Sequence, residues 1–66
     1  MMDNFSKAVD LVVRNQRASV SYISKTLGIP YLEAVDIILE LESTGVVTLP
    51  NHVGKREVLL KPEDLD

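Results

Sequence analysis

The chain has 66 residues, a formal net charge of −3 at neutral pH and no cysteine. A domain of this size buries about 60% of the surface that its unfolded chain would expose, so we expect one small domain over residues 1–66. The composition excludes a disulfide framework and a thiolate zinc site, and no apolar run approaches the roughly 18 residues of a membrane span. The N-terminus lacks the pattern of a signal peptide, so we expect a cytoplasmic protein without membrane contact.

Charge is distributed unevenly along the chain. Residues 31–44 contribute −4, residues 62–66 contribute −3, and the remaining residues together carry +4. The net acidity argues against the uniformly basic surface of many nucleic-acid binders, but most of the chain is basic. We therefore expect an ordered, mostly basic core at residues 4–61 that carries one acidic segment and is followed by an acidic tail at 62–66.

A first helix is predicted near the N-terminus. Asp3 or Asn4 can cap it, and apolar residues recur at spacings of three and four until the pattern ends near Asn15. The segment 17–20 that follows is short and partly β-branched. It therefore predicts a single bridge of sheet between the first helix and the second.

Two further helices follow, joined by a tight turn. Ser21 can cap the second helix, which runs as far as Leu27, and Gly28 suits its termination. Pro30 has a fixed φ and no amide hydrogen, so it suits the first turn of a third helix over residues 31–44. Two helices joined by a short turn that contains glycine are typical of a helix-turn-helix.

A β-hairpin is predicted after the third helix. Gly45 can terminate that helix, and residues 46–49 and 57–60 are strand-like segments separated by a hairpin-type turn at 50–55. Residues 62–66 have no periodic apolar pattern and predict a frayed acidic tail or the stub of a linker to something outside this chain. The fold class is therefore mainly α with a small β-hairpin: a winged helix-turn-helix of three helices and a two-stranded wing.

The third helix has two different faces when its residues are placed at about 100° intervals. The inner face predicts packing against the first two helices: Ala34, Ile37, Ile38 and Leu41, with Tyr31 and Val35 beside them. The opposite face holds Leu32, Asp36, Leu39 and Ser43, flanked by Glu33 and Glu40. A DNA-reading helix carries cations or amides there, whereas carboxylates repel phosphates. Acids near a helix N-terminus also have an ordinary explanation, because they interact favourably with the helix dipole.

Several short motifs occur in order along most of the chain. They are Arg17-Ala18-Ser19-Val20-Ser21, then Leu27, Ile29, Tyr31 and Ala34, then Glu42 and Gly45-Val46-Val47, and finally Gly54 and Arg56-Glu57-Val58-Leu59. With these motifs the chain resembles, from Phe5 to Leu60, the gamma domain at the C-terminus of the FtsK/SpoIIIE DNA translocases. The resemblance implies a winged helix that binds short polar sequences in duplex DNA and orients the translocase motor. In some members of that family the domain also contacts the XerD recombinase.

The reading helix departs from the pattern that is usual in that family. Where relatives have Arg-Ile-Gly-Tyr-Asn-Arg-Ala-Ala-Arg-Leu-Ile-Glu, this chain has Gly28-Ile29-Pro30-Tyr31-Leu32-Glu33-Ala34-Val35-Asp36-Ile37-Ile38-Leu39. The apolar core positions are retained, but an asparagine is replaced by Leu32 and two arginines by Glu33 and Asp36. The resemblance therefore implies the fold and the wing residues Lys55 and Arg56, but not sequence-specific readout by the third helix.

Two functional hypotheses follow. In the first, the chain binds duplex DNA, weakly or with altered specificity, through a set of cations: Arg17, Lys25, Lys55 and Arg56. In the second, it is a protein-interaction module whose acidic and apolar ridge docks a second copy or a DNA-processing or motor protein: Leu32, Glu33, Asp36 and Leu39. Scattered solvated charges are the ordinary alternative to the first hypothesis, and isolated exposed leucines are the ordinary alternative to the second.

Catalytic, metal and cofactor sites are not predicted. His52 is the one histidine of the chain and lies at the hairpin tip, where no cysteine or second histidine accompanies it as a metal ligand. No nucleophile–base pair can be assembled, so we expect neither an enzyme nor a small-molecule substrate. The hydroxyls of Ser21 and Ser24 are candidate phosphate contacts, although capping explains Ser21 equally well.

Overall fold

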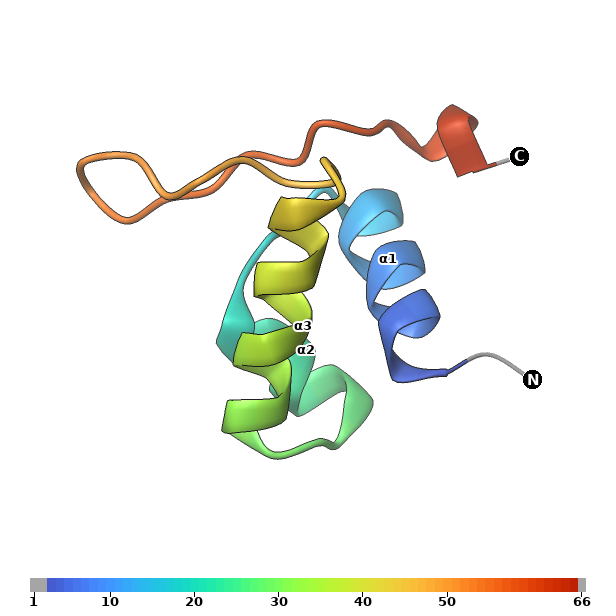
Figure 1. Cartoon of the computed structure of the whole chain (residues 1–66). Coiled ribbons are helices and arrows are strands. Elements are labelled where there is room, and N and C mark those ends of the chain that lie inside the picture. Colours follow the sequence, from blue (N-terminus) through green and yellow to red (C-terminus); the bar gives the residue numbers. More distant parts are fainter. Residues whose placement is uncertain (1–2, 66) are drawn as a thin grey trace.

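The computed structural model describes residues 3–65, which form three α-helices, an extended segment and a short 3-10 helix (Figure 1). The helices are α1 (Asn4–Asn15), α2 (Val20–Leu27) and α3 (Tyr31–Ser43), and the 3-10 helix is η1 (Pro62–Leu65). α2 packs against α3, and both contact α1. Within residues 3–65, none of the helices combines the length and the apolar character that crossing a bilayer requires.

Local hydrogen bonds define both ends of α1. The carboxylate of Asp3 accepts a hydrogen bond of 2.7 Å from the backbone N–H of Ser6, which confirms Asp3 as the cap and lowers the pKa of its carboxyl group. At the other end, Gln16 adopts a left-handed conformation with φ 52°, which is uncommon outside glycine. Its side-chain amide donates to the backbone oxygens of Val13 at 2.7 Å and Leu60 at 2.8 Å. Gln16 therefore joins the end of α1 to the C-terminal part of the chain.

The start of α2 differs from the prediction. Ser19, and not Ser21, is the cap: its hydroxyl accepts a hydrogen bond of 3.3 Å from the backbone N–H of Tyr22. The bridge of sheet expected at 17–20 is therefore wrong, because Val20 is already the first residue of the helix. Capping by serine outweighs the weak strand preference of a short β-branched segment. The end of the helix is as predicted, since Gly28 is left-handed with φ 67°.

The boundaries of α3 agree with the prediction to within one residue. Pro30 precedes the helix with ψ 147° instead of lying in its first turn, and its carbonyl accepts a hydrogen bond of 3.1 Å from Ala34 N–H. Proline is compatible with either position, because it has no amide hydrogen to leave unpaired. After Thr44, Gly45 has φ 84°, which confirms it as the residue that ends the helix.

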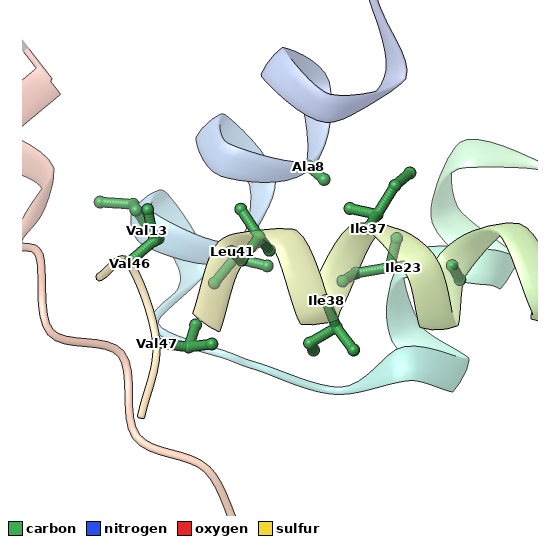
Figure 2. Packing of buried hydrophobic residues seen from close by; sticks show 10 residues of the cluster. Ala8, Val13, Ile23, Ile37, Ile38, Leu41, Val46 and Val47 are labelled. Atoms are coloured by element: carbon green, nitrogen blue, oxygen red, sulfur yellow. The ribbon is translucent and has the colours of Figure 1, made fainter. Parts of the chain in front are cut away.

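The hydrophobic core lies between the three helices and the first residues after α3 (Figure 2). Its buried members are Ala8, Val12, Val13, Ile23, Ala34, Ile37, Ile38, Leu41, Val46 and Val47. The predicted inner face of α3 is confirmed, because all four of its expected core residues are buried. Tyr31 is the exception beside that face: its side chain is 58% exposed, since it lies in the first turn at the edge of the packed region.

Residues 46–60, called here the arm, leave the end of α3, run out to a loop that projects away from the helices, and return to them (Figure 1). Two segments of the arm run antiparallel, with backbone hydrogen bonds from Thr48 N–H to the Glu57 carbonyl at 2.9 Å and from Leu59 N–H to the Val46 carbonyl at 2.8 Å. Among residues 3–65 they form only one isolated bridge, Val47–Val58, and no strand. The two-stranded wing is therefore not confirmed.

The hydrogen bonding of the arm explains why a longer ladder is absent within the described residues. The N–H groups of Val46 and Val47 donate to the carbonyl of Leu41 at the end of α3, at 2.8 and 3.4 Å. The Val46 N–H is therefore not available to pair with the second segment of the arm, whereas the Val47 N–H points away from that segment, because Val47 and Val58 form a non-hydrogen-bonded pair. Pro50 then removes another donor where the first segment ends.

The acidic C-terminal segment is better ordered than the sequence predicts. A frayed tail at 62–66 is wrong for the part that is described, because η1 forms there and contacts α1. The Asp64 carboxylate accepts a hydrogen bond of 2.8 Å from the Lys61 N–H, and Leu65 packs against the core. Asp66 lies outside the described residues.

Candidate nucleic-acid interface

The outward side of α3, called here the α3 outer face, consists of Leu32, Asp36, Leu39, Glu40 and Ser43, all of them exposed. Leu32 is 78% exposed and Leu39 is 49% exposed. The expectation that these two leucines point into solvent is therefore confirmed. Since the face contains two carboxylates and no cation, its charge repels phosphate.

Glu33 has a structural partner that the sequence did not indicate. Its carboxylate accepts a hydrogen bond of 2.7 Å from the side-chain amide of Asn4, which lies in the first turn of α1. Glu33 therefore links the first turns of α1 and α3, in addition to its favourable position near a helix N-terminus. This bond accounts for the acid without requiring a binding partner.

A groove of about 420 Å³ lies between the start of α2 and the tip of the arm. One side is formed by the segment from Ala18 to Ser21, the other by the segment from Val53 to Arg56, and Tyr31 and Ile38 of α3 also contribute. The hydroxyls of Ser19 and Ser21 are hydrogen-bonded to each other at 3.1 Å on the α2 side, so one of the two O–H groups is left to donate to a ligand. The groove therefore combines a pair of serine hydroxyls on one side with the two cations of the arm on the other.

The two arm cations have different environments. Lys55 is exposed, and no hydrogen bond or ion pair of its ammonium group is found among the described residues. Arg56 is half-buried, and its guanidinium group donates to the carboxylate of Glu42 and, at 3.2 Å, to the backbone carbonyl of Thr48. Lys55 is therefore the cation that is available for an anionic partner, whereas Arg56 is engaged within the protein.

The other two predicted cations lie outside the groove lining. The guanidinium carbon of Arg17 lies 4.5 Å from the centroid of the Tyr22 ring, a cation–π contact that holds this exposed side chain directly before Ala18. Lys25 is exposed in the last turn of α2 and does not line the groove. The structure therefore brings Lys55 and Arg56 together, places Arg17 next to the groove in the chain, and leaves Lys25 apart.

The remaining candidates have simple explanations. The hydroxyl of Ser24 donates to the carbonyl of Ile29 at 2.7 Å, so it stabilises the turn between α2 and α3. His52 is exposed in the loop of the arm, as expected. No group of three or more histidine, aspartate or glutamate side chains within residues 3–65 could hold a metal ion.

Comparison with known proteins identifies the family. The sequence model described as the Ftsk gamma domain matches residues 3–61. The chain belongs to the FtsK gamma domain family. Similar proteins named DNA translocase FtsK include those of Mesorhizobium japonicum, with 47% identity over 94% of this chain, and Brucella melitensis, with 45% identity over 97%. A third, from Rickettsia typhi, is 45% identical over 85% of the chain. This gamma domain spans only 7–8% of the length of these relatives.

Sequence reasoning missed several residues that shape the groove of this gamma domain. Ser19 caps α2 and lines the groove, a role that had been assigned to Ser21. Glu42 was identified as part of the acidic segment and of the family motifs, but its ion pair with Arg56 was not predicted. The motif Arg17-Ala18-Ser19 contained a signal for the first, because serine precedes an apolar helix there. The second depends on a contact between residues 14 positions apart, which no local pattern reveals.

Proposed function

We propose that this gamma domain binds duplex DNA through the groove between α2 and the arm, and not through the α3 outer face. The observation that carries the proposal is the composition of the groove: the free cation of Lys55 opposite the hydroxyls of Ser19 and Ser21. Membership of the FtsK gamma domain family supports DNA as the partner. The relatives are named as DNA translocases, and we infer that this domain serves such a protein as a DNA contact.

The chemistry of the groove suits a phosphate backbone. An ammonium group and hydroxyl donors bind phosphate oxygens, and neutralising phosphates releases counterions, which provides sequence-independent affinity. Arg17, held against Tyr22 next to this region, would add a further cation on the α2 side. Contacts of this kind fix the position of a protein on the duplex without reading its bases.

The α3 outer face limits sequence specificity in this proposal. Leu32 and Leu39 can make only apolar contacts, and the carboxylates of Asp36 and Glu40 would face phosphates of like charge. A single carboxylate can accept a hydrogen bond from a cytosine amino group, but it cannot reproduce the bidentate contacts of arginine or asparagine. We therefore expect weak binding with little preference among sequences, in a winged-helix fold whose wing is the arm.

Fluorescence anisotropy with a labelled duplex of mixed sequence tests the proposal. At low salt the affinity should be measurable, and its logarithm should fall linearly with the logarithm of the salt concentration, by about 0.9 for each phosphate contact. Equal affinity for unrelated sequences would agree with phosphate contacts alone. Undetectable binding at the lowest salt concentration at which the domain is stable would contradict the proposal.

A second candidate function follows from the exposed leucines. Their exposure, with Asp36 between them in sequence, makes an acidic and apolar ridge on which a second copy or a DNA-processing or motor protein could dock. Sedimentation velocity over a range of protein concentrations tests self-association. If the ridge is the interface, the wild type dimerises and the Leu39→Asp variant stays monomeric; a monomeric wild type at high concentration excludes the dimer.

A further inference from the structure

The side chain of Arg56 connects the outer part of the arm to the end of α3. The Nη1 atom of Arg56 donates to the carboxylate of Glu42, in the last turn of α3, and to the backbone carbonyl of Thr48, in the opposite segment of the arm. One nitrogen therefore holds three parts of the chain together: both segments of the arm and the end of α3. The groove side formed by the arm begins at this point, because Arg56 follows Lys55 directly.

The environment of the Glu42–Arg56 pair makes it stronger than an ordinary surface pair. The Arg56 side chain is 15% exposed and the Glu42 side chain is 23% exposed, so water competes weakly for both. By contrast, both side chains of the Arg14–Asp10 pair on α1 are 46% exposed. Because the Glu42–Arg56 pair is the less exposed of the two, solvent and salt screen its charges less, and its geometry is maintained in solution.

The base of the arm is anchored by Val46 and Val47, which are buried in the core, and by the hydrogen bond from Gln16 to the Leu60 carbonyl, but few interactions hold its outer part in place. Its two segments share one β-bridge and a small number of backbone hydrogen bonds, and the Thr48 hydroxyl accepts one further bond of 3.0 Å from the Glu57 N–H. At the tip, Leu49 and Val53 are exposed and so contribute little burial. The direction of the tip therefore depends strongly on the ion pair at the base of the arm.

We propose that Glu42 and Arg56 are positioning residues that fix the arm over α2, so that Lys55 lines the groove with Ser19 and Ser21. This inference rests on the proposed function, because it assigns the groove geometry a role in DNA binding. Arg56 acts through the arm and does not itself contact the duplex. Glu42, although acidic, therefore supports the binding of an acidic polymer.

The proposal predicts that removing the Glu42 carboxylate lowers the affinity for DNA, which is the opposite of the usual effect. Removing a carboxylate from a DNA-binding protein ordinarily strengthens binding, because a charge that repels phosphate is lost. The Glu42→Ala variant should instead weaken binding, because the arm is no longer fixed. Glu40→Ala provides the matched control: it removes an exposed carboxylate two residues earlier on the same helix and leaves the pair intact.

Amide hydrogen exchange tests the position of the arm without DNA. The N–H groups of Thr48 and Leu59 report the pairing of the two segments, and that of Ile38 reports the core. In Glu42→Ala we expect the two arm amides to exchange at least about fivefold faster. The exchange rate of the Ile38 amide should change only as much as any change in the global free energy of unfolding requires. In Glu40→Ala all three should exchange as in the wild type. Unchanged arm amides in Glu42→Ala would overturn the inference, whether or not the domain binds DNA.

Anisotropy on a mixed-sequence duplex, with both variants folded, completes the test. Glu42→Ala should bind at least about threefold more weakly than the wild type, with the salt dependence of the wild type because Lys55 itself is retained, whereas Glu40→Ala should bind at least as tightly as the wild type. Tighter binding with a steeper salt dependence would show that the freed Arg56 contacts phosphate, and would overturn the inference. A wild type that does not bind DNA contradicts the proposed function instead, while the exchange data still decide what holds the arm.

Discussion

Two exposed surfaces of this small domain differ in chemistry although the same core supports both. The α3 outer face presents leucines and carboxylates, whereas the groove between α2 and the arm presents an ammonium group and hydroxyls. α3 contributes to both surfaces, because its exposed residues form the outer face and its residues Tyr31 and Ile38 line part of the groove. The backbone therefore determines where a surface lies, while a few side chains determine which kind of partner can bind to it.

The largest expected effect is on the free energy of unfolding, which should respond very differently to substitutions on the inner and outer faces of α3. Ile38→Ala removes a buried side chain and should lower the free energy of unfolding by about 2–5 kcal/mol, enough to unfold much of so small a domain. Leu39→Ala, one residue later on the outer face, should change it by less than about 0.5 kcal/mol. Urea unfolding followed by circular dichroism measures both. A comparable loss for Leu39→Ala would show that the outer face is part of the packed structure.

The next effect would convert the outer face into a DNA-reading surface. Changing Leu32→Asn, Glu33→Arg and Asp36→Arg together should raise the affinity for duplex DNA by at least about tenfold, because two repulsive charges become two attractive ones on one helix face. Glu63→Arg, on η1, controls for the change in net charge.

The triple variant also loses the hydrogen bond between Asn4 and Glu33, so circular dichroism must first establish that it is folded. No gain in affinity in a folded triple variant would mean that the outer face of α3 does not approach the duplex. The anisotropy assay with a mixed-sequence duplex provides the measurement.

A smaller effect concerns the groove. Lys55→Ala should weaken DNA binding by about 1 kcal/mol, roughly fivefold, and reduce the salt slope by about 0.9, because one phosphate contact is lost. Lys7→Ala removes the same charge from α1, whose residues do not line the groove, and should leave the slope nearly unchanged. If the two variants behave alike, the affinity reflects net charge and not the groove.

The smallest effect lies outside both surfaces and separates stability from binding. The hydrogen bond from Ser6 lowers the pKa of Asp3, so the cap of α1 stabilises the fold fully above the ordinary pKa of an aspartate and is lost as the pH falls through the lowered value. Between neutral pH and about pH 3 the melting temperature of Asp3→Asn should therefore fall slightly less than that of the wild type. At neutral pH its DNA affinity should be unchanged; a change would connect the cap to the groove.

Much of the helical structure could be predicted because its determinants are local. The spacing of apolar residues predicted the buried face of α3, and Gly28 and Gly45 marked helix ends because they can adopt positive φ. The predicted start of α2 differed from the observed start because Ser19 and Ser21 are both suitable caps. Only the hydrogen bond from the Tyr22 N–H identifies Ser19 as the cap.

The arm and the C-terminal segment could not be predicted in the same way. The arm lacks a two-stranded ladder because the Val46 amide bonds to the end of α3 and Pro50 has no amide hydrogen, and the role of Arg56 depends on Glu42 in that helix. η1 is ordered by its contact with α1, from which it is separated by most of the chain. Of the four predicted cations, the sequence could not indicate that one would be paired internally while another stays free.

Nuclear magnetic resonance of the labelled domain, titrated with a mixed-sequence duplex at low salt, tests the central claim most directly. If the groove is the DNA-binding surface, the largest shifts occur at the amides from Ser19 to Ser21 and from Gly54 to Arg56, while Asp36, Leu39 and Glu40 shift little. Shifts concentrated on the α3 outer face, with the groove amides unchanged, would contradict the account.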